Sequence, residues 1–146
     1  SIKDSVLILV MSDDKKRIMV DMSATLIHHG HIRLLKQAKN LGTVIVALTT
    51  DNEIKKAKGY IPELTYENRK EILLSIKYVD EVIPSDWLID EIFLKKNNID
   101  LLVHGHDNSN PINKAKLVIF NRTKGISSTI LRERVLSSHY SKKKSK

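Results

Sequence analysis

The chain has 146 residues, of which 41% are hydrophobic and 29% are charged, and this length and composition fit one compact globular domain. The sequence contains no cysteine, which excludes a disulfide framework, a thiolate zinc site and a cysteine nucleophile. The longest apolar run, residues 6–11, is too short to span a bilayer and lacks the features of a signal peptide. We therefore expect a cytoplasmic protein without a membrane partner.

The formal net charge of +8 comes from 25 lysines and arginines against 17 acidic residues, and it indicates an anionic partner. Residues 141–146 contain four lysines and no acidic residue. We expect residues 139–146 to form a basic, disordered tail, which leaves a smaller excess on the folded body. This distribution favours a phosphorylated small molecule over nucleic acid as the partner.

Short apolar runs alternate with amphipathic stretches along the chain. In chain order, the first half of the sequence predicts a strand or extension at 6–11, a strand at 18–22, a helix that ends near Leu41 with Gly42 as its cap, a strand at 43–49 and a charged loop at 51–60. The second half predicts a helix at 66–77, a strand at 79–83 ended by Pro84, and a helix at 88–96. Strands at 100–104 and 117–120 and a last helix at 127–136 follow. The apolar residues expected to be buried in the two middle helices are Ile72, Leu73, Ile76, Leu88, Ile89, Ile92 and Phe93.

Strands that alternate with helices predict an α/β fold with a Rossmann-like parallel sheet and helices on both faces. In such a sheet, ligands bind beyond the carboxyl ends of the strands. We therefore expect the functional residues in the loops that follow Met22, Thr49, His104 and Phe120.

Three histidines lie within the tetrad from His28 to His31, which follows a predicted strand and opens a predicted helix. A helix N-terminus offers free backbone N–H groups, Gly30 allows an anion to approach the backbone, and imidazoles donate hydrogen bonds to phosphoryl oxygens. This pattern indicates a phosphate site. Two alternatives remain open: capping and surface histidines, or a histidine metal site that includes His104 and His106.

A second candidate anion site is the run from Arg122 to Thr129, which also follows a strand and opens a helix. Arginine binds phosphate through two parallel hydrogen bonds, and Ser127 and Ser128 suit a helix N-terminus. Simple helix capping is the alternative. Lysines in the 51–60 loop, Lys58 among them, could neutralise transferring phosphates, although a charged loop is usually only solvated.

The HxGH tetrad and the RTxGISxT run together resemble the cytidylyltransferases, such as the glycerol-3-phosphate and choline-phosphate cytidylyltransferases. The resemblance extends from about Ile18 to Val135. It implies a cytidylyltransferase domain with a nucleotidyltransferase fold at residues 18–138, preceded by an N-terminal extension or extra strand at 1–17. The run from Val20 to His31 resembles the branch of the family that acts on phosphonates, such as 2-aminoethylphosphonate, or on unusual capsule precursors.

The resemblance implies transfer of CMP from CTP to a small phosphorylated or phosphonate acceptor, with release of pyrophosphate, by a Mg²⁺-dependent homodimer. It implies catalytic roles for His28, His31 and Lys58. The residues that it implies for nucleotide binding are Ser23, Gly30, Arg69, Arg122, Thr123, Gly125, Ile126, Ser127 and Ser128. It assigns no metal ligand. The alternative functions are an ATP-dependent adenylyltransferase of the same superfamily and a non-catalytic protein that binds nucleotide or nucleic acid.

Overall fold

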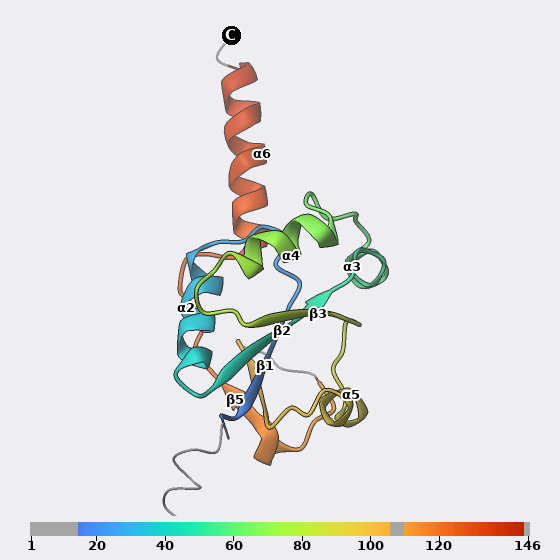
Figure 1. Cartoon of the computed structure of the whole chain (residues 1–146). Helices are drawn as coiled ribbons and strands as arrows, with labels where there is room; N and C mark the ends of the chain where they lie inside the picture. Colours follow the sequence, from blue (N-terminus) through green and yellow to red (C-terminus); the bar gives the residue numbers. More distant parts are fainter. Residues whose placement is uncertain (1–14, 106–109, 145–146) are drawn as a thin grey trace, which may run out of the picture.

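The structure is a computed structural model that describes residues 15–105 and 110–144 (Figure 1). Its centre is a five-stranded parallel sheet in the order β3-β2-β1-β4-β5. The strands are β1 (Arg17–Met22), β2 (Thr43–Thr49), β3 (Glu81–Ser85), β4 (Leu101–His104) and β5 (Leu117–Ile119). The expected strand at residues 6–11 lies outside the described residues.

The helices are α2 (His29–Lys39), α3 (Asp51–Lys58), α4 (Tyr66–Leu74), α5 (Glu91–Lys96) and α6 (Ser128–Lys144), with a 3₁₀ turn at Lys114–Lys116. One buried cluster joins α2 and α4 to one face of the sheet, through residues such as Leu35 and Leu73. A second cluster, which includes Leu94 of α5, covers the other face. The predicted Rossmann-like sheet with helices on both faces is confirmed.

The register of the strands decides which side chains reach which face. Ile18 pairs with Val44 on one side and with Leu101 on the other. Ile18 and Val20 belong to the cluster on the α2 and α4 side, whereas Met19 belongs to the cluster on the α5 side. Because side chains alternate along a strand, Asp21 follows Met19 on the α5 side, at the carboxyl end of β1.

The segment predicted as a loop at 51–60 contains helix α3, so this prediction is wrong. The Thr50 hydroxyl caps the helix by accepting a hydrogen bond from the Glu53 N–H, and Gly59 ends it in the left-handed conformation at φ 78°. Acidic residues in the first turn and lysines in the last turn complement the helix dipole. The helix buries only Ile54, so its hydrophobic pattern is too weak to recognise in the sequence.

Gly42 does not cap α2, which ends at Lys39 with Asn40 as its cap. Gly42 is instead required by a close approach, because a Cβ at this position would lie 2.1 Å from the backbone oxygen of Lys16. The neighbouring residue Thr43 donates its N–H to the same oxygen at 2.8 Å. This contact holds the turn between α2 and β2 against the start of β1.

Pro84 lies inside β3, in register with Leu48 of β2, and does not end the strand. Because β3 is the first strand in the sheet order, a residue without an N–H is tolerated there.

Helices α4 and α5 are shorter than predicted. Ser75 caps α4 after Leu74, and Asp90 starts α5 by accepting the N–H of Phe93. Three of the residues expected to be buried are exposed: Ile72, Leu88 and Ile92, the last of which is 76% exposed. The sheet contacts a narrower stripe of these helices than the spacing of apolar residues suggests.

The expectation of a disordered tail is wrong for residues 139–144, because α6 continues to Lys144. No glycine or proline interrupts the sequence after Gly125, and lysine and arginine favour helices. Figure 1 shows α6 extending away from the sheet. Within the described residues, no helix combines the length and the apolar character needed to cross a membrane.

Candidate active site at the carboxyl ends of the strands

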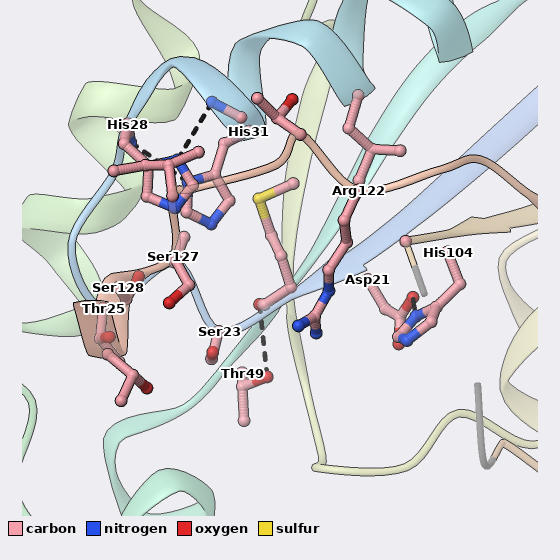
Figure 2. Close-up of a pocket in the computed structure, with 18 of the residues that line it drawn as sticks. Asp21, Ser23, Thr25, His28, His31, Thr49, His104, Arg122, Ser127 and Ser128 are labelled. Carbon is pink, nitrogen blue, oxygen red and sulfur yellow. Dashed lines mark hydrogen bonds and ion pairs between the residues drawn. The ribbon is translucent and has the colours of Figure 1, made fainter. Parts of the chain in front are cut away.

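A cavity of about 520 Å³ opens beyond the carboxyl ends of β1, β2 and β4 and is bordered by the N-termini of α2 and α6 (Figure 2). Ten of the twelve predicted site residues line it: Ser23, His28, Gly30, His31, Lys58, Arg122, Thr123, Ile126, Ser127 and Ser128. The chain therefore brings together, as predicted, two motifs that are almost a hundred residues apart in the sequence.

His28 and His31 form the cap of helix α2. The Nδ1 atom of His28 accepts the N–H of Gly30 at 3.0 Å, and the Nδ1 atom of His31 accepts the N–H of His28 at 3.2 Å. An imidazole nitrogen that accepts a backbone hydrogen bond carries no proton, so the ring proton of each neutral histidine is on Nε2. The cap therefore fixes both imidazoles as Nε2–H donors.

Both histidines are held in the neutral form. Burial, together with electrostatic repulsion from His28 and Arg122, lowers the pKa of His31 to about 3. Burial, with the neighbouring His29, also lowers the pKa of His28. The two ring centroids are 4.0 Å apart, so two charged imidazoles would repel each other strongly. The pair can thus donate hydrogen bonds to an anion without first losing a proton.

Gly30 leaves room for the ring of His28. A Cβ at this position would lie 2.8 Å from Cε1 and 2.9 Å from Nδ1 of His28, and 3.4 Å from Cγ2 of Ile126. Because the backbone cap fixes the His28 ring, this ring cannot move aside without losing its hydrogen bond. The glycine of the tetrad therefore sets the position of the first histidine.

The second motif combines a phosphate donor with helix capping. Arg122 reaches into the cavity and has neither an ion pair nor a side-chain hydrogen bond among the described residues (Figure 2). The Ser127 hydroxyl caps α6 by accepting the N–H of Ile130 at 3.0 Å. Ser128 donates its hydroxyl to the Leu26 carbonyl at 2.9 Å and so ties α6 to the segment before the histidine tetrad. Arg122 thus remains available to an anion, while the two serines order the helix N-terminus.

Arg69 was predicted to bind nucleotide, but its side chain is fully buried and does not line the cavity. Its guanidinium donates to the carbonyls of Ser23, Thr49 and Leu64 and forms a 2.6 Å ion pair with Asp51. Arg69 therefore supports the loops of the site from behind. No alternation of apolar residues signals this role, because the partners are backbone oxygens from distant segments.

Gly125 also lies outside the cavity lining. It adopts φ 78° in the turn before α6, a conformation that glycine accepts without strain. Its role in the motif is to reverse the chain between Arg122 and Ser127.

Lys58 borders the cavity beside an aromatic rim. Its ammonium lies 5.7 Å from the centre of the Trp87 ring, which with Tyr60 also lines the cavity. The Tyr60 ring in turn stacks at 4.4 Å on the guanidinium of Arg132, which binds Glu63 through two hydrogen bonds. The segment after α3 is therefore attached to α6 across the edge of the cavity.

Sequence reasoning missed a polar pair at the opposite end of the cavity, Asp21 and His104 (Figure 2). Their Oδ1 and Nδ1 atoms lie 2.6 Å apart, and Asn110 donates to the second oxygen of Asp21 at 3.0 Å. The sequence suggests His104 only as a possible metal ligand together with His106, a residue that lies outside the described residues. Among the described residues, no group of three or more acidic or histidine side chains could hold a metal ion.

The comparisons with known proteins show the family to which this chain is similar. The cytidylyltransferase-like family model matches residues 23–134, which include both motifs. A glycerol-3-phosphate cytidylyltransferase of Staphylococcus aureus is 40% identical over 126 residues, covering 81% of this chain and 93% of that protein. An ethanolamine-phosphate cytidylyltransferase of Dictyostelium discoideum is 35% identical and covers 82% of this chain and 36% of that protein. An FAD synthase of Pyrococcus horikoshii is 38% identical, covering 66% of each chain.

A solved structure, the lipopolysaccharide core biosynthesis protein of Thermoplasma volcanium, shares the fold with a TM-score of 0.61 at 22% identity, over 77% of this chain and 99% of that chain. The family match covers most of the chain, and its two motifs meet in one cavity. The chain therefore belongs to the cytidylyltransferase-like family and is a nucleotidyltransferase.

Proposed function

We propose that this protein transfers CMP from CTP to a small phosphorylated acceptor and releases pyrophosphate. The observation that carries the proposal is that one cavity contains two neutral Nε2–H imidazoles, an arginine that has no ion pair or side-chain hydrogen bond within the described part of the chain, and the N-termini of two helices. Each of these groups stabilises negative charge. The names of the relatives support the cytidylyl group as the group transferred.

The reaction needs positioning and charge stabilisation. An anionic oxygen of the acceptor attacks the α-phosphorus of CTP, the bond from this phosphorus to the bridging oxygen breaks, and pyrophosphate leaves with the electron pair. A phosphate oxygen is already ionised near neutral pH, so no general base is required. In this mechanism, His28 and His31 donate hydrogen bonds to the α-phosphate and the departing pyrophosphate, and Arg122 balances the charge that the phosphates bring. Lys58 contacts the phosphates from the edge of the cavity.

Mg²⁺ enters this proposal with the nucleotide. The described residues do not fit a metal site built by the protein, because they contain no cluster of metal-binding side chains. Asp21 is the acidic side chain among the described residues that line the cavity, and both of its oxygens already accept hydrogen bonds. Mg²⁺ is commonly held by substrate phosphates with few protein ligands. The substrate that we propose is therefore the magnesium complex of CTP.

The acceptor that we propose is a small phosphomonoester or phosphonate. Glycerol 3-phosphate and ethanolamine phosphate are candidates because relatives are named for them, and a phosphonate is a candidate because the segment from Val20 to His31 resembles that branch. The test is pyrophosphate release from CTP and Mg²⁺ with each acceptor, together with phosphocholine and 2-aminoethylphosphonate. Release that depends on one acceptor would support the proposal, and no release with any of them would contradict it.

The decisive variant is His31→Ala, with His29→Ala as its matched control. His29 is exposed and does not line the cavity. We expect His31→Ala to reduce kcat by about a hundredfold, because it removes a hydrogen-bond donor from the transition state, and His29→Ala to leave it nearly unchanged. A loss of thermal stability with unchanged kcat in His31→Ala would show that the histidine is only structural.

An adenylyltransferase is the second candidate function, and the similarity to an FAD synthase favours it, because FAD contains an adenylyl group. Calorimetric titration with CTP and with ATP distinguishes the two. Binding of ATP alone would replace cytidylyl with adenylyl transfer in the proposal.

We also propose that the protein functions as a homodimer, as the family resemblance implies. The exposed apolar side chains of α4 and α6, Ile72, Leu74, Val135 and Leu136, support self-association. Sedimentation equilibrium tests this proposal, since a monomeric mass at micromolar concentration would contradict it.

A further inference from the structure

The pair formed by Asp21 and His104 stands at the point where the sheet order reverses. From β1, the chain adds β2 and β3 on one side of the sheet and then returns to add β4 and β5 on the other side of β1. In parallel sheets, this switch point is where ligands bind. Asp21 is the penultimate residue of β1 and His104 is the last residue of β4, and their side chains are 11% and 23% exposed. Both line the cavity, and the phosphate chemistry described above uses neither.

The pair is fixed by a further residue. Asn110 donates to Asp21 Oδ2 at 3.0 Å and accepts the backbone N–H of Ile89 at 2.7 Å. Both oxygens of Asp21 are thus engaged, one by Asn110 and one by His104. This network joins β1, β4 and the segment before α5, so the His104 ring is held in one orientation.

The contact with Asp21 decides what His104 can offer to a ligand. A carboxylate only accepts hydrogen bonds, so Nδ1 of His104 carries a proton, and in the neutral form of the ring Nε2 is an acceptor. Nε2 of His104 has no hydrogen-bond partner among the described residues. His28 and His31 have the opposite tautomer, with Nε2–H as a donor. The cavity therefore presents donors at one end and an acceptor at the other.

Arg122 divides these two ends. Figure 2 shows its guanidinium between the two motif histidines and the pair of Asp21 and His104. Its side chain also lies against Gly105, the residue after His104, since a Cβ on Gly105 would be 3.7 Å from Arg122 Cγ. A carboxylate disfavours phosphate nearby, whereas the donor end attracts it. A nucleotide fits this polarity with its phosphates at the histidine tetrad and its nucleoside near His104.

We propose that His104 recognises the nucleoside of the bound nucleotide by accepting a hydrogen bond on Nε2, and that Asp21 is the positioning residue that fixes this tautomer. The inference rests on the function proposed above. The recognised group is a donor of the nucleoside, either the exocyclic amine of the base or a ribose hydroxyl. The neighbouring arginine favours the nucleotide over the acceptor, because Arg122 belongs to the motif that the family resemblance assigns to nucleotide binding.

Asp21→Asn tests the pair because it reverses the tautomer while keeping the shape of the side chain. Asn110 donates to one position of the new amide, which places the amide oxygen there and the amide NH₂ toward His104. Nδ1 must then accept, and Nε2 becomes a donor. His104→Phe is the second variant, since it keeps a ring and removes both nitrogens. The controls are Asp86→Asn and His139→Phe, which change exposed residues outside the cavity lining.

The measurement is the affinity for CTP, UTP and 2′-deoxy- and 3′-deoxy-CTP by calorimetry, without acceptor, after thermal unfolding has shown that each variant is folded. If the base amine is recognised, we expect Asp21→Asn and His104→Phe to reduce the preference for CTP over UTP by about tenfold or more. If a ribose hydroxyl is recognised, we expect the same fall in the preference over the matching deoxynucleotide. The controls should keep the native ratios.

Two results would overturn this inference, and a third would overturn the proposed function on which it rests. Unchanged ratios in both folded variants would overturn it. A changed KM for an amine-bearing acceptor with unchanged nucleotide ratios would move the pair to the acceptor site and also overturn it. Absence of nucleotide binding by the native protein would overturn the proposed function itself. If the native protein binds CTP and the variants keep its nucleotide preferences, only the role of His104 and Asp21 is overturned.

Discussion

At the scale of single residues, the histidine tetrad shows how a helix cap prepares a site for its ligand. The backbone N–H of His28 donates a hydrogen bond to Nδ1 of His31, and the N–H of Gly30 donates one to Nδ1 of His28. This arrangement stabilises the start of α2 and also aims two Nε2–H donors at the cavity. The same hydrogen bonds thus contribute to stability and to anion binding, which makes the tetrad sensitive to small displacements.

Substitution Gly30→Ala tests that sensitivity. The added methyl group would lie 2.8 Å from the His28 ring, which must move and lose its bond to the backbone. A displacement on the order of 1 Å in a catalytic group costs up to about a hundredfold in rate, so we expect kcat to fall by about ten- to a hundredfold. Steady-state kinetics on folded protein measure this. Native kcat in Gly30→Ala would show that the ring tolerates displacement.

At the scale of secondary-structure elements, two junctions hold the site together. The α2–β2 turn packs against the start of β1 at Gly42, and the connection between α3 and α4 is attached to α6 through Glu63 and Arg132. Neither junction belongs to a motif. Each joins segments that carry motif residues.

Gly42→Ala should lower stability and leave the chemistry intact. Its Cβ would overlap the Lys16 carbonyl oxygen, a backbone atom that moves only with β1. Overpacking of this kind costs about 1–3 kcal/mol, which urea unfolding measures. At temperatures where the variant is folded, kcat should match the native value. A stability equal to the native protein would mean that the turn relaxes freely.

Glu63→Gln should loosen the connection between α3 and α4. The Glu63 carboxylate accepts two hydrogen bonds from Arg132, which hold the pKa of Glu63 below its usual value. Because the pair is solvent-exposed, we expect a loss of less than about 1 kcal/mol in stability. Tryptic cleavage after Lys58, followed by mass spectrometry, should nevertheless be several times faster than in the matched control Glu67→Gln. Equal cleavage rates would show that Tyr60 and its neighbours hold the segment without Glu63.

The same elements show what could be read from the sequence. A β-branched, nearly continuous run predicted β2, and shorter apolar runs predicted β1 and β4, because strands buried on both faces need apolar residues throughout. The two motifs were found because their residue types carry the chemistry themselves. Helix α3 was not predicted because only its Thr50 cap and one buried residue, Ile54, mark it in the sequence. The pair of Asp21 and His104 was not predicted because the two residues are 83 positions apart in the sequence. They lie together only because β1 and β4 are neighbours in the sheet.

At the scale of the whole molecule, the neutral histidines link the stability of the fold to pH. The pKa of His31 is about 3 in the folded protein and near 6.5 in the unfolded chain. Between these values, the unfolded chain binds more protons than the folded protein. The free energy of unfolding therefore decreases as the pH falls below about 6.5, and the decrease continues toward pH 3. His28 contributes in the same direction, because its pKa is also lowered.

His31→Gln should flatten this dependence. One histidine of this kind contributes a slope of at most about 1.4 kcal/mol per pH unit, and glutamine contributes none. Urea unfolding at pH 7.5, 6 and 5 measures the difference. The control His139→Gln changes an exposed histidine of α6 and should retain the native slope. Parallel curves for the native protein and His31→Gln would show that other groups dominate acid unfolding.

Pro84 on the outer strand β3 has a consequence for how copies of this chain can meet. An open strand edge is a template on which another chain can add a strand through its backbone. Pro84 has no N–H to offer, so this edge presents an interrupted ladder. Growth of the sheet from copy to copy, the first step toward fibrous aggregates, is disfavoured along β3. Ordered association along this edge must then rely on side chains that fit each other, which is the kind of contact that stops at a defined number of subunits.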